Sequence, residues 1–380
     1  MDLPAPSAAA RLFAGVTDPR VERTRRHLLC DILLIALCAT LAGAEGFCDM
    51  AEWGEMKAGW LRTFLDLPGG IPSHDTFERV FRRLDPKELH ACFLRWIESA
   101  ASVGRGSQHL AVDGKTLRRS FDGPEGGHAL HVVSAFAADG LGLVLGQVAV
   151  DDKSNEITAI PGLLRLLDLK GAVVTIDAMG CHKAIAAQIA SQGGDYLLAL
   201  KGNHPVLCAD VARLFGDAPT LAAQRPTRAE TVEKDHGRIE TRRAAALEVG
   251  GLLGGIRGLA AWPGVQSVVM IEARREPAAG GVASVERRFF LSSLPADATR
   301  LLQVARGHWA IENKLHWMLD VHFDEDRCRV RKDHAPLNLA TLRRVALSLA
   351  KRDTLSKASV RRRLKCAGWD DAYLFRLLNI

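Results

Sequence analysis

The first part of the chain has the apolar pattern of packed helices. Residues 27–41, HLLCDILLIALCATL, are apolar nearly all round, which is typical of a helix buried on every side. Amphipathic helices are predicted at 73–85 and 85–100, and the second begins with aspartate and proline, a favourable pair for a helix start. These patterns predict a small α-helical domain over residues 1–101, which ends at a glycine-bearing linker, 102–108.

Beyond this linker the pattern becomes that of strands, at first in succession and then alternating with helices. Residues 171–179, GAVVTIDAM, form a continuous β-branched run that is typical of a strand covered on both faces. Strands in succession followed by strand–helix alternation predict a mixed α/β sheet, with further strand-like segments at 218–295 and helices from residue 297 on. The predicted strands before the 218–295 segment are 109–117, 131–140, 142–150, 171–179 and 195–202.

The composition agrees with a folded protein large enough for two domains. The chain has 380 residues, of which 48% are hydrophobic and 25% charged, which is ordinary for a globular protein. Its eight cysteines are scattered and form no CxxC pair. We therefore expect reduced thiols in a cytoplasmic protein, not a disulfide framework or a zinc cage.

One segment resembles a secretory signal, because Arg25 and Arg26 precede an apolar run and several small residues. Asp31 interrupts that run near its start, and the uninterrupted part, 32–44, has 13 residues, whereas a membrane span needs about 20. The segment is therefore predicted to be a buried helix, and no membrane segment is expected.

Positive charge is concentrated near the C-terminus, where basic helices are predicted at 351–380. The net charge of the chain is +6, yet the stretch from Arg327 to Lys365 holds 13 lysines and arginines against two acids, Asp333 and Asp353. Such a block favours a polyanionic partner, because each neutralised phosphate releases condensed counterions. The alternative is a solvated helix face with no partner.

Three acids occupy positions that suit chemistry. Asp113 ends the first predicted strand and Asp177 ends the strand in 171–179, so both can face a crevice at a sheet edge, although aspartate also ends many strands as a turn residue. Glu312 lies on an apolar predicted helix and shares one face with His308 and His316. That trio could bind zinc; alternatively, Glu312 points at the two aspartates.

Converging carboxylates need cations, because without them they repel one another and take up protons. Mg²⁺ and Mn²⁺ prefer such hard oxygen ligands, and two such ions about 4 Å apart can activate a water or a 3′-hydroxyl for attack on a phosphodiester. The three acids together with the basic block therefore predict a metal-dependent site that acts on nucleic acid.

Several long strings of this sequence resemble bacterial insertion-sequence transposases of the DDE type, in the branch that includes the H-repeat-associated proteins. The resemblance covers about residues 15–352. In the first domain it is carried by DILLIALCATLAGAEGFCDMAEW and GIPSHDTFERVFRRLDP. In the second it is carried by AVDGKTLRRS, TIDAMGC, GGDYLLALKGN, DHGRIETR and GHWAIENKLHWMLDVHFDEDRCRVR. Strings of this length and order are far more specific than three acids alone.

The resemblance implies an RNase H-like mixed-sheet catalytic core over 106–350, with a β-rich insertion at about 218–295 between the second and third acids. It implies that Asp113, Asp177 and Glu312 form the catalytic, metal-binding triad, with spacings of 64 and 135 residues. The ions would be Mg²⁺ or Mn²⁺, two of them, and the substrate double-stranded DNA.

The implied reaction is nicking by water at the element ends, followed by transfer of the freed 3′-hydroxyl to target DNA without a covalent protein–DNA intermediate. The N-terminal domain is expected to bind DNA, and a homodimer is expected to pair two ends. Two alternatives stay open. The chain could be an RNase H-like nuclease without strand transfer, or a catalytically decayed protein that only binds element ends.

The chain departs from the family around its glutamate. Related transposases often carry tyrosine, arginine and lysine at offsets of minus seven, minus four and plus seven, where this chain has Ala305, His308 and Leu319, so those roles are not transferred. The candidates for DNA or phosphate contact are basic or polar residues near strand ends and in the basic block: Lys115, Lys201, Asn203, His204, Arg238, His308, Arg343 and Arg344.

Four further residues have two interpretations each. Trp309 and Trp317 could stack on a displaced base, but their apolar helix favours a place in the core. Lys153 and Glu156 could support the acids, or they could be surface residues at the start of a helix.

Overall fold

The computed structural model describes most of the chain. The predicted linker at 102–108 and the candidate Lys153 lie outside the described residues. The described residues are 13, 15–101, 109–121, 128–140, 142–150, 155–235, 237–252, 254–277 and 282–378.

The first part of the chain is helical, as predicted. Its helices are η1 (Glu22–Thr24), α2 (Leu29–Leu41), α3 (Phe47–Met56), α4 (Ala58–Leu61), α5 (His74–Arg83) and α6 (Pro86–Ala101). α2 is buried from Asp31 to Leu41, which confirms the predicted buried helix. α6 begins at Pro86, and the Asp85 carboxylate accepts a hydrogen bond of 2.8 Å from the Lys87 N–H, as expected of a capping residue. Within the described part of the chain, no helix combines the length and apolarity needed to cross a membrane.

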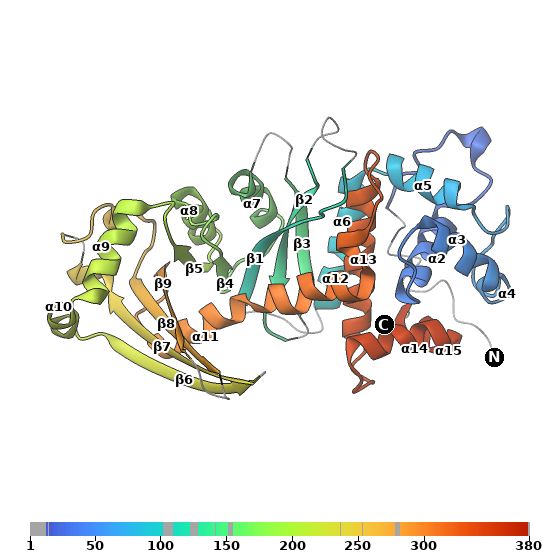
Figure 1. Ribbon diagram of the computed structural model, residues 1–380. Helices are drawn as coiled ribbons and strands as arrows, with labels where there is room; N and C mark the ends of the chain where they lie inside the picture. Colours follow the sequence, from blue (N-terminus) through green and yellow to red (C-terminus); the bar gives the residue numbers. More distant parts are fainter. Residues whose placement is uncertain are drawn as a thin grey trace.

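A mixed sheet of nine strands forms the centre of the described residues (Figure 1). The strands are β1 (His109–Thr116), β2 (His131–Ala137), β3 (Val144–Ala149), β4 (Val173–Ile176), β5 (Asp195–Leu200), β6 (Thr227–Asp235), β7 (Arg238–Glu248), β8 (Ser267–Pro277) and β9 (Ser284–Ser292). Their spatial order is β3-β2-β1-β4-β5-β9-β8-β7-β6. β1 runs parallel to β4 and antiparallel to β2, and β4 runs parallel to β5, which confirms the mixed sheet.

The strand-rich segment predicted at 218–295 extends this sheet and does not form a separate layer. β9 pairs antiparallel with β5, and β8, β7 and β6 continue outward from it. Cross-strand ion pairs join the outer strands, such as Arg243 with Glu230 and Arg287 with Glu272. These charges suit a sheet end that faces solvent and discourage pairing with another strand edge.

Helices cover both faces of the sheet. α7, α8 and α9 lie on the face that buries Val112, Val174 and Leu198, whereas α11 lies on the opposite face against Val173 and Leu197. The remaining helices are α7 (Glu156–Leu164), α8 (Lys183–Ser191), α9 (Pro205–Gly216), α10 (Ala218–Ala223), η2 (Val249–Gly251), η3 (Leu259–Ala261), α11 (Ala298–His308), η4 (Glu312–His316), α12 (Trp317–Phe323), η5 (Glu325–Arg327), α13 (Ala335–Arg352), α14 (Val360–Trp369) and α15 (Asp371–Leu378).

One long helical run, drawn in orange in Figure 1, crosses from the β6–β9 end of the sheet to α13. It consists of α11, the π-helical segment η4 and α12. Leu301 and Ala305 of its first half pack against the sheet, whereas Leu315 and Leu319 of its second half pack in a core shared with α13 and the N-terminal helices. The run is therefore held at its two ends by two different hydrophobic cores.

Candidate active site

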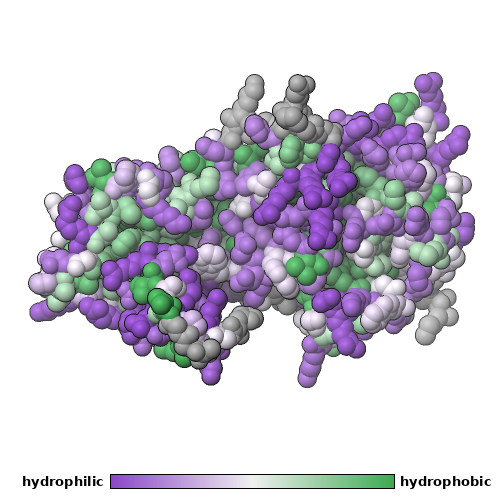
Figure 2. All heavy atoms as spheres, in the orientation of Figure 1, coloured by the Kyte–Doolittle hydropathy of each residue, from purple (hydrophilic) through white to green (hydrophobic). Residues whose placement is uncertain are grey.

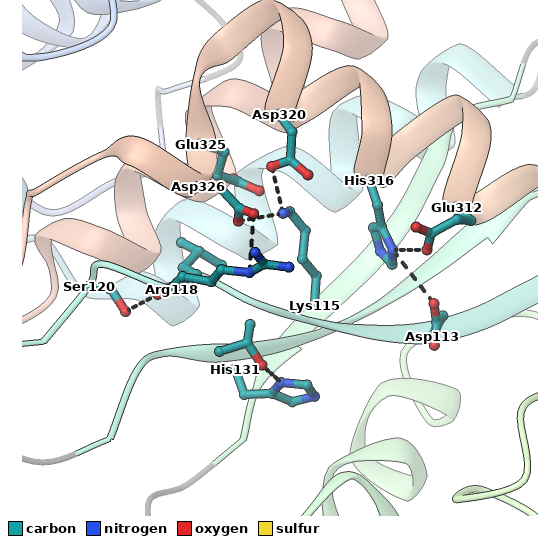
Figure 3. A network of polar contacts seen from close by, with 12 residues as sticks. Asp113, Lys115, Arg118, Ser120, His131, Glu312, His316, Asp320, Glu325 and Asp326 are labelled. Carbon is teal, nitrogen blue, oxygen red and sulfur yellow. Dashed lines mark hydrogen bonds and ion pairs between the residues drawn. The ribbon is translucent and has the colours of Figure 1, made fainter.

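One face of β1 directs polar side chains toward this helical run. Asp113 and Lys115 are two residues apart in the strand, so they point to the same side, which Figure 3 shows to be the side of the helix. The helix presents Glu312, His316 and Asp320 at intervals of four residues, which places them on one helix face. Strand and helix thus meet along two rows of ionisable groups.

The sheet register places Asp177 beside Asp113. β1 and β4 are parallel with Val112 opposite Ile176, and each strand residue is followed directly by its aspartate. Asp113, Asp177 and Glu312 all line one open cavity of about 250 Å³. The structure therefore brings the three acids singled out in the sequence to a single cavity.

His316 lies between two of these acids (Figure 3). Its Nδ1 atom is 3.5 Å from Asp113 Oδ2 and 3.3 Å from Glu312 Oε2. The side chain of His316 is only 6% exposed, against 54% for that of Glu312. The sequence pointed to His316 only as part of a possible zinc trio with His308 and Glu312, and not as a neighbour of Asp113.

The helix widens into a π-turn where Glu312 and His316 stand. The Trp317 N–H donates to the Glu312 carbonyl, five residues back, and the Lys314 carbonyl accepts a hydrogen bond of 2.7 Å from Lys351 Nζ on α13. Single π-turns inside α-helices occur frequently at functional sites. A buried lysine thus holds the backbone of the turn that carries the third acid.

The two aspartates and the glutamate have opposite electrostatic environments. Burial raises the pKa of Asp113 to about 6, although the nearby His316 opposes that rise. Burial, followed by the charge of Glu156, also raises the pKa of Asp177. The hydrogen bond from His316 lowers the pKa of Glu312. The positive charge near Asp113 and Asp177, from His316 and Lys201, therefore does not offset their burial, whereas the hydrogen bond from His316 outweighs the burial of Glu312.

Glu156 is a fourth acid near the site. It is buried, and its Oε1 atom lies 2.6 Å from His131 Nε2. Its charge raises the pKa of both Asp113 and Asp177. Gly114 leaves room for this pair, because a Cβ atom at that position would collide with Glu156 and His131. Glu156 therefore packs beside the strand that carries Asp113; it begins α7, as its second interpretation expects, but it is buried and not on the surface.

The prediction that Lys115 contacts DNA is wrong, because its ammonium group is buried and already paired. Its Nζ atom lies 2.6 Å from Asp320 Oδ1 and 2.9 Å from Asp326 Oδ1 (Figure 3). Lys115 instead ties β1 to the region of α12 and η5, two residues away from Asp113. This ion-pair network fixes the separation between the strand and the helix at the site.

Lys201, Asn203 and His204 lie in the loop after β5, next to the loop that contains Asp177. Lys201 is exposed, lines the cavity and counteracts the rise in the pKa of Asp177. Asn203 Nδ2 donates to the Ala178 carbonyl at 2.6 Å, and His204 Nε2 lies 2.8 Å from the Cys181 carbonyl. Lys201 can therefore meet a phosphate, while Asn203 and His204 brace the loop after Asp177.

His308 faces the sheet and not the other members of the proposed zinc trio. Its Nδ1 atom is 3.0 Å from Thr175 Oγ1, whereas Glu312 and His316 turn toward Asp113. The interpretation of His308, Glu312 and His316 as a zinc site is therefore wrong. Burial lowers the pKa of His308 to about 4, so the ring is neutral near pH 7 and offers no charge to a phosphate.

The two tryptophans of this helix are on the surface, so their assignment to the core is wrong. Trp309 is 46% exposed and Trp317 is 52% exposed. Trp309 lines the cavity, and the Arg288 guanidinium lies 4.8 Å from its ring centroid. An aromatic surface beside a cation is available next to the acids.

Arg343 and Arg344 do not contact DNA, because both are buried in α13 with 1% and 0% exposure. Arg344 Nη1 is 2.9 Å from Glu325 Oε1, and Arg343 donates to the Glu45 carbonyl. Arg238, at the start of β7, is exposed but lies outside the residues that line the cavity. The exposed cations of the basic block are Arg327, Arg329, Lys332, Lys357, Arg361, Arg362 and Lys365.

The visible face of the molecule is mainly hydrophilic, with strongly hydrophilic side chains over the region between β2 and α13 (Figure 2). The charge of Arg361 on α14 contributes to the lowered pKa of His322 on α12, although burial is the larger cause. α14 therefore brings a cation near the C-terminal part of the helical run.

The donor set fits a hard divalent cation. Ligand atoms of Asp113, Glu312 and His316 all lie within 4.8 Å of one another, and Asp177 lines the same cavity. Carboxylate oxygens are the ligands preferred by Mg²⁺ and Mn²⁺. A divalent ion would supply the positive charge that the buried carboxylates of Asp113 and Asp177 lack.

Comparisons with known proteins agree with this geometry. Residues 104–349 match the family described as "Transposase DDE domain", and residues 10–97 match the one described as "DDE_Tnp_1-associated". The chain is 38% identical over 373 residues to the H repeat-associated putative transposase YhhI of Escherichia coli K12, covering 96% of this chain and 95% of that protein.

Two further relatives are described in different ways, one as a putative transposase and one as inactive. The chain is 35% identical over 364 residues to the putative transposase YncI of Escherichia coli O157:H7, covering 96% and 92% of the two chains. It is 46% identical over 54 residues, 14% of this chain and 64% of the other, to the inactive transposase YbfQ of Escherichia coli K12. The matches confirm the expected resemblance and the RNase H-like core.

Proposed function

We propose, because the chain belongs to the DDE transposase family, that it cuts DNA at the ends of an insertion sequence and joins the freed 3′ ends to target DNA. The observation that carries this proposal is the common cavity of Asp113, Asp177 and Glu312. Asp113 within β1, Asp177 directly after β4 and Glu312 on the helical run are held by rigid elements, as a phosphoryl-transfer site requires.

The reaction divides into a hydrolysis and a transesterification. In the first, a water oxygen attacks the phosphorus at the element end, the bond from phosphorus to O3′ breaks, and a 3′-hydroxyl is freed. In the second, that hydroxyl attacks a target phosphodiester, a new phosphorus–oxygen bond forms, and a target 3′-hydroxyl leaves. The hydrolysis turns one phosphodiester into a 3′-hydroxyl and a 5′-phosphate, and the transesterification replaces one phosphodiester by another, so no covalent bond to the protein is needed.

Asp113, Asp177 and Glu312 would hold two Mg²⁺ or Mn²⁺ ions. Such ions supply activation of the attacking oxygen and stabilisation of the leaving oxygen. The chain itself places Lys201 where it can bind the phosphate, and it keeps Glu312 aligned through the π-turn of the helix. Lys115 positions β1 against α12 but does not meet the substrate.

Duplex DNA would extend from the cavity over exposed cations. On one side these include Arg361, Arg362 and Lys365 of α14, and on the N-terminal domain they include Arg79 and Arg83 of α5. We propose that residues 1–101 bind the element ends and that two copies pair two ends in the cytoplasm. Sedimentation of the protein with one and with two duplex ends tests the pairing.

The decisive experiment incubates the purified protein with its own terminal repeats in Mg²⁺, in Mn²⁺ and in EDTA. We expect nicking with either ion and joined product when pre-cleaved ends meet target DNA. Nicking without any joined product would show that the protein is a nuclease and not a transposase. Binding without cleavage in either ion would show that it only binds element ends.

A matched variant separates chemistry from binding. Asp113→Ala should abolish nicking while duplex binding in EDTA stays within twofold of the unmodified protein. If Asp113→Ala still cleaves, the acids at this cavity are not the catalytic site.

A further inference from the structure

His316 occupies the position of a metal ligand, although it is not one of the three acids of the family. The residues whose ligand atoms lie within 4.8 Å of one another are Asp113, Glu312 and His316. The imidazole is buried, and its Nδ1 atom faces both carboxylates.

We propose that Nδ1 of His316 is a protein ligand, together with Asp113 and Glu312, of one divalent ion in this site. The inference rests on the proposed function in one respect, namely that the site binds such an ion. Asp177, which lines the same cavity, would then help to hold the second ion.

The distances favour coordination over a simple hydrogen bond. Two neighbouring ligands of an octahedral ion with bonds of about 2.1 Å lie about 3 Å apart. His316 Nδ1 lies 3.3 Å from the Glu312 oxygen and 3.5 Å from the Asp113 oxygen, a few tenths of an ångström beyond that separation. A charge-assisted hydrogen bond to a carboxylate would be shorter, about 2.7–2.9 Å. Nδ1 thus makes a long hydrogen bond to Glu312 and lies only slightly farther from Asp113, so the ring points into the space between the two carboxylates.

The surroundings fix the ring in this place. Leu315 and Leu319, on either side of it in the sequence, are fully buried. Lys351 Nζ holds the Lys314 carbonyl of the same π-turn at 2.7 Å and also donates to the Gly142 carbonyl at 2.7 Å. Among the described residues no hydrogen-bond partner is found for the buried Nε2 atom of His316, so Nδ1 is the atom that meets polar groups. A ligand held in this way is preorganised for its ion.

A nitrogen ligand has a consequence for metal choice. Imidazole binds transition ions well, whereas Mg²⁺ prefers oxygen ligands and water. We therefore expect the unmodified protein to bind Mn²⁺ more tightly than Mg²⁺. We also expect His316→Asn, which places an amide oxygen near the position of Nδ1, to weaken Mn²⁺ binding and to narrow the difference between the two ions.

The test measures metal binding without DNA and without any turnover. Mn²⁺ is titrated into the full-length protein and followed by electron paramagnetic resonance, and electron spin-echo modulation of the bound ion reports a directly bonded nitrogen. We expect nitrogen modulation in the unmodified protein, a change in its pattern after ¹⁵N-histidine labelling, and its loss in both His316→Asn and His316→Phe.

The matched control is His322→Gln, which alters a histidine further along the same helix, on α12. That variant should keep the modulation and the Mn²⁺ affinity, whereas His316→Phe should bind Mn²⁺ at least about tenfold more weakly, the loss seen even for residues that merely orient ligands. Circular dichroism melts check that each variant is folded.

The outcomes separate this inference from the proposed function. Bound Mn²⁺ without nitrogen modulation in the folded protein overturns the assignment of His316 and leaves the transposase proposal intact. Nitrogen modulation in a protein that never cleaves DNA supports the assignment of His316 as a ligand and contradicts the proposed transposase activity. If His316→Phe is folded and keeps full Mn²⁺ affinity, His316 is not a ligand.

Discussion

Replacing Asp113 by asparagine should make the metal-free protein more stable at neutral pH. The Asp113 carboxylate is desolvated, and burial raises its pKa from the ordinary 3.8 to about 6. Because the folded-state pKa lies above the unfolded value, the folded state binds the proton more tightly. The ionised group therefore destabilises the fold above pH 6, and this penalty disappears as the pH falls toward 4. Asparagine keeps the shape and removes the charge.

The magnitude follows from the shift. A rise of about two pKa units corresponds to about 3 kcal/mol at pH 7.5 and roughly half of that at pH 5. The side chain is 23% exposed, so residual hydration makes these figures upper values. We expect Asp113→Asn to raise the free energy of unfolding by about 1–3 kcal/mol at pH 7.5 in EDTA, and by about half as much at pH 5.

Urea unfolding at the two pH values measures this effect, and metal reverses it. Saturating Mn²⁺ at a hundred times its dissociation constant should stabilise the unmodified protein by about 2.7 kcal/mol and leave Asp113→Asn almost unchanged. The control is Asp75→Asn on α5, whose side chain is 70% exposed and whose loss should matter by less than about 0.5 kcal/mol. An Asp113→Asn protein that is folded but less stable than the unmodified protein at pH 7.5 in EDTA would refute the reasoning.

Three further variants test the charged residues near the site and in the basic block. Lys115→Met leaves two carboxylates without their cation and should lower the free energy of unfolding by about 2–3 kcal/mol in urea melts. Arg344→Met strands the fully buried Glu325 and should cost about 3–5 kcal/mol, while a filter-binding salt titration should show an unchanged slope for DNA affinity. The double variant Arg361→Gln with Arg362→Gln should instead lose one or two phosphate contacts. Each lost contact should reduce the slope of log affinity against log salt concentration by about 0.9, with the melting temperature unchanged. Equal slopes for the arginine pair and the unmodified protein would remove α14 from the DNA surface.

Local patterns were enough to predict the elements and two of the acids. The all-round apolar stretch at 27–41 became the buried α2, and the β-branched run at 171–179 contains the buried β4. Asp177 directly follows β4, but the prediction that Asp113 ends its strand is wrong, because β1 continues to Thr116 in its pairing with β2. The two acids still follow the paired residues Val112 and Ile176, so their proximity follows once β1 and β4 are neighbours. This kind of inference needs only the period of the side chains and the direction of the strands.

The wrong assignments of Arg343, Arg344 and Lys115 to DNA have a common physical cause. Each side chain is paired with a residue elsewhere in the sequence, and the sequence alone does not show that pairing. The sequence shows Arg343 and Arg344 as a pair of cations inside PLNLATLRRVALSLAKR, but not that Glu325 and the Glu45 carbonyl receive them inside a core. The apolar residues on both sides of the pair were a signal of burial that the count of charges ignored. Lys115 was likewise assigned to DNA because its partners, Asp320 and Asp326, lie about 200 residues away.

The position of His316 beside Asp113 was not predicted, for a related reason. Helical spacing placed it on the face of Glu312, but it did the same for His308, and nothing in the sequence divides the two. The division comes from the sheet, since Thr175 of β4 receives His308 while Asp113 of β1 faces His316. Which strand lies under which turn of a helix depends on packing across the whole domain, so it is a property of the fold.

The same packing explains how the protein tolerates a costly group of acids. Asp113 and Asp177 are ionisable groups in a desolvated place, and each destabilises the metal-free fold above its raised pKa. The elements that carry them do not depend on the acids for support: β1 pairs with β2 and β4, β4 also pairs with β5, and Val112 and Val174 are buried in a hydrophobic core. Another core holds the helix after Glu312 against α13 and the N-terminal helices. Lys115 adds an ionic tie between strand and helix two residues from Asp113. Because the scaffold is fixed by contacts outside the cavity, the acids can stay close together without an ion. A divalent ion relieves the unfavourable electrostatic energy of the desolvated acids, and this relief favours ion binding.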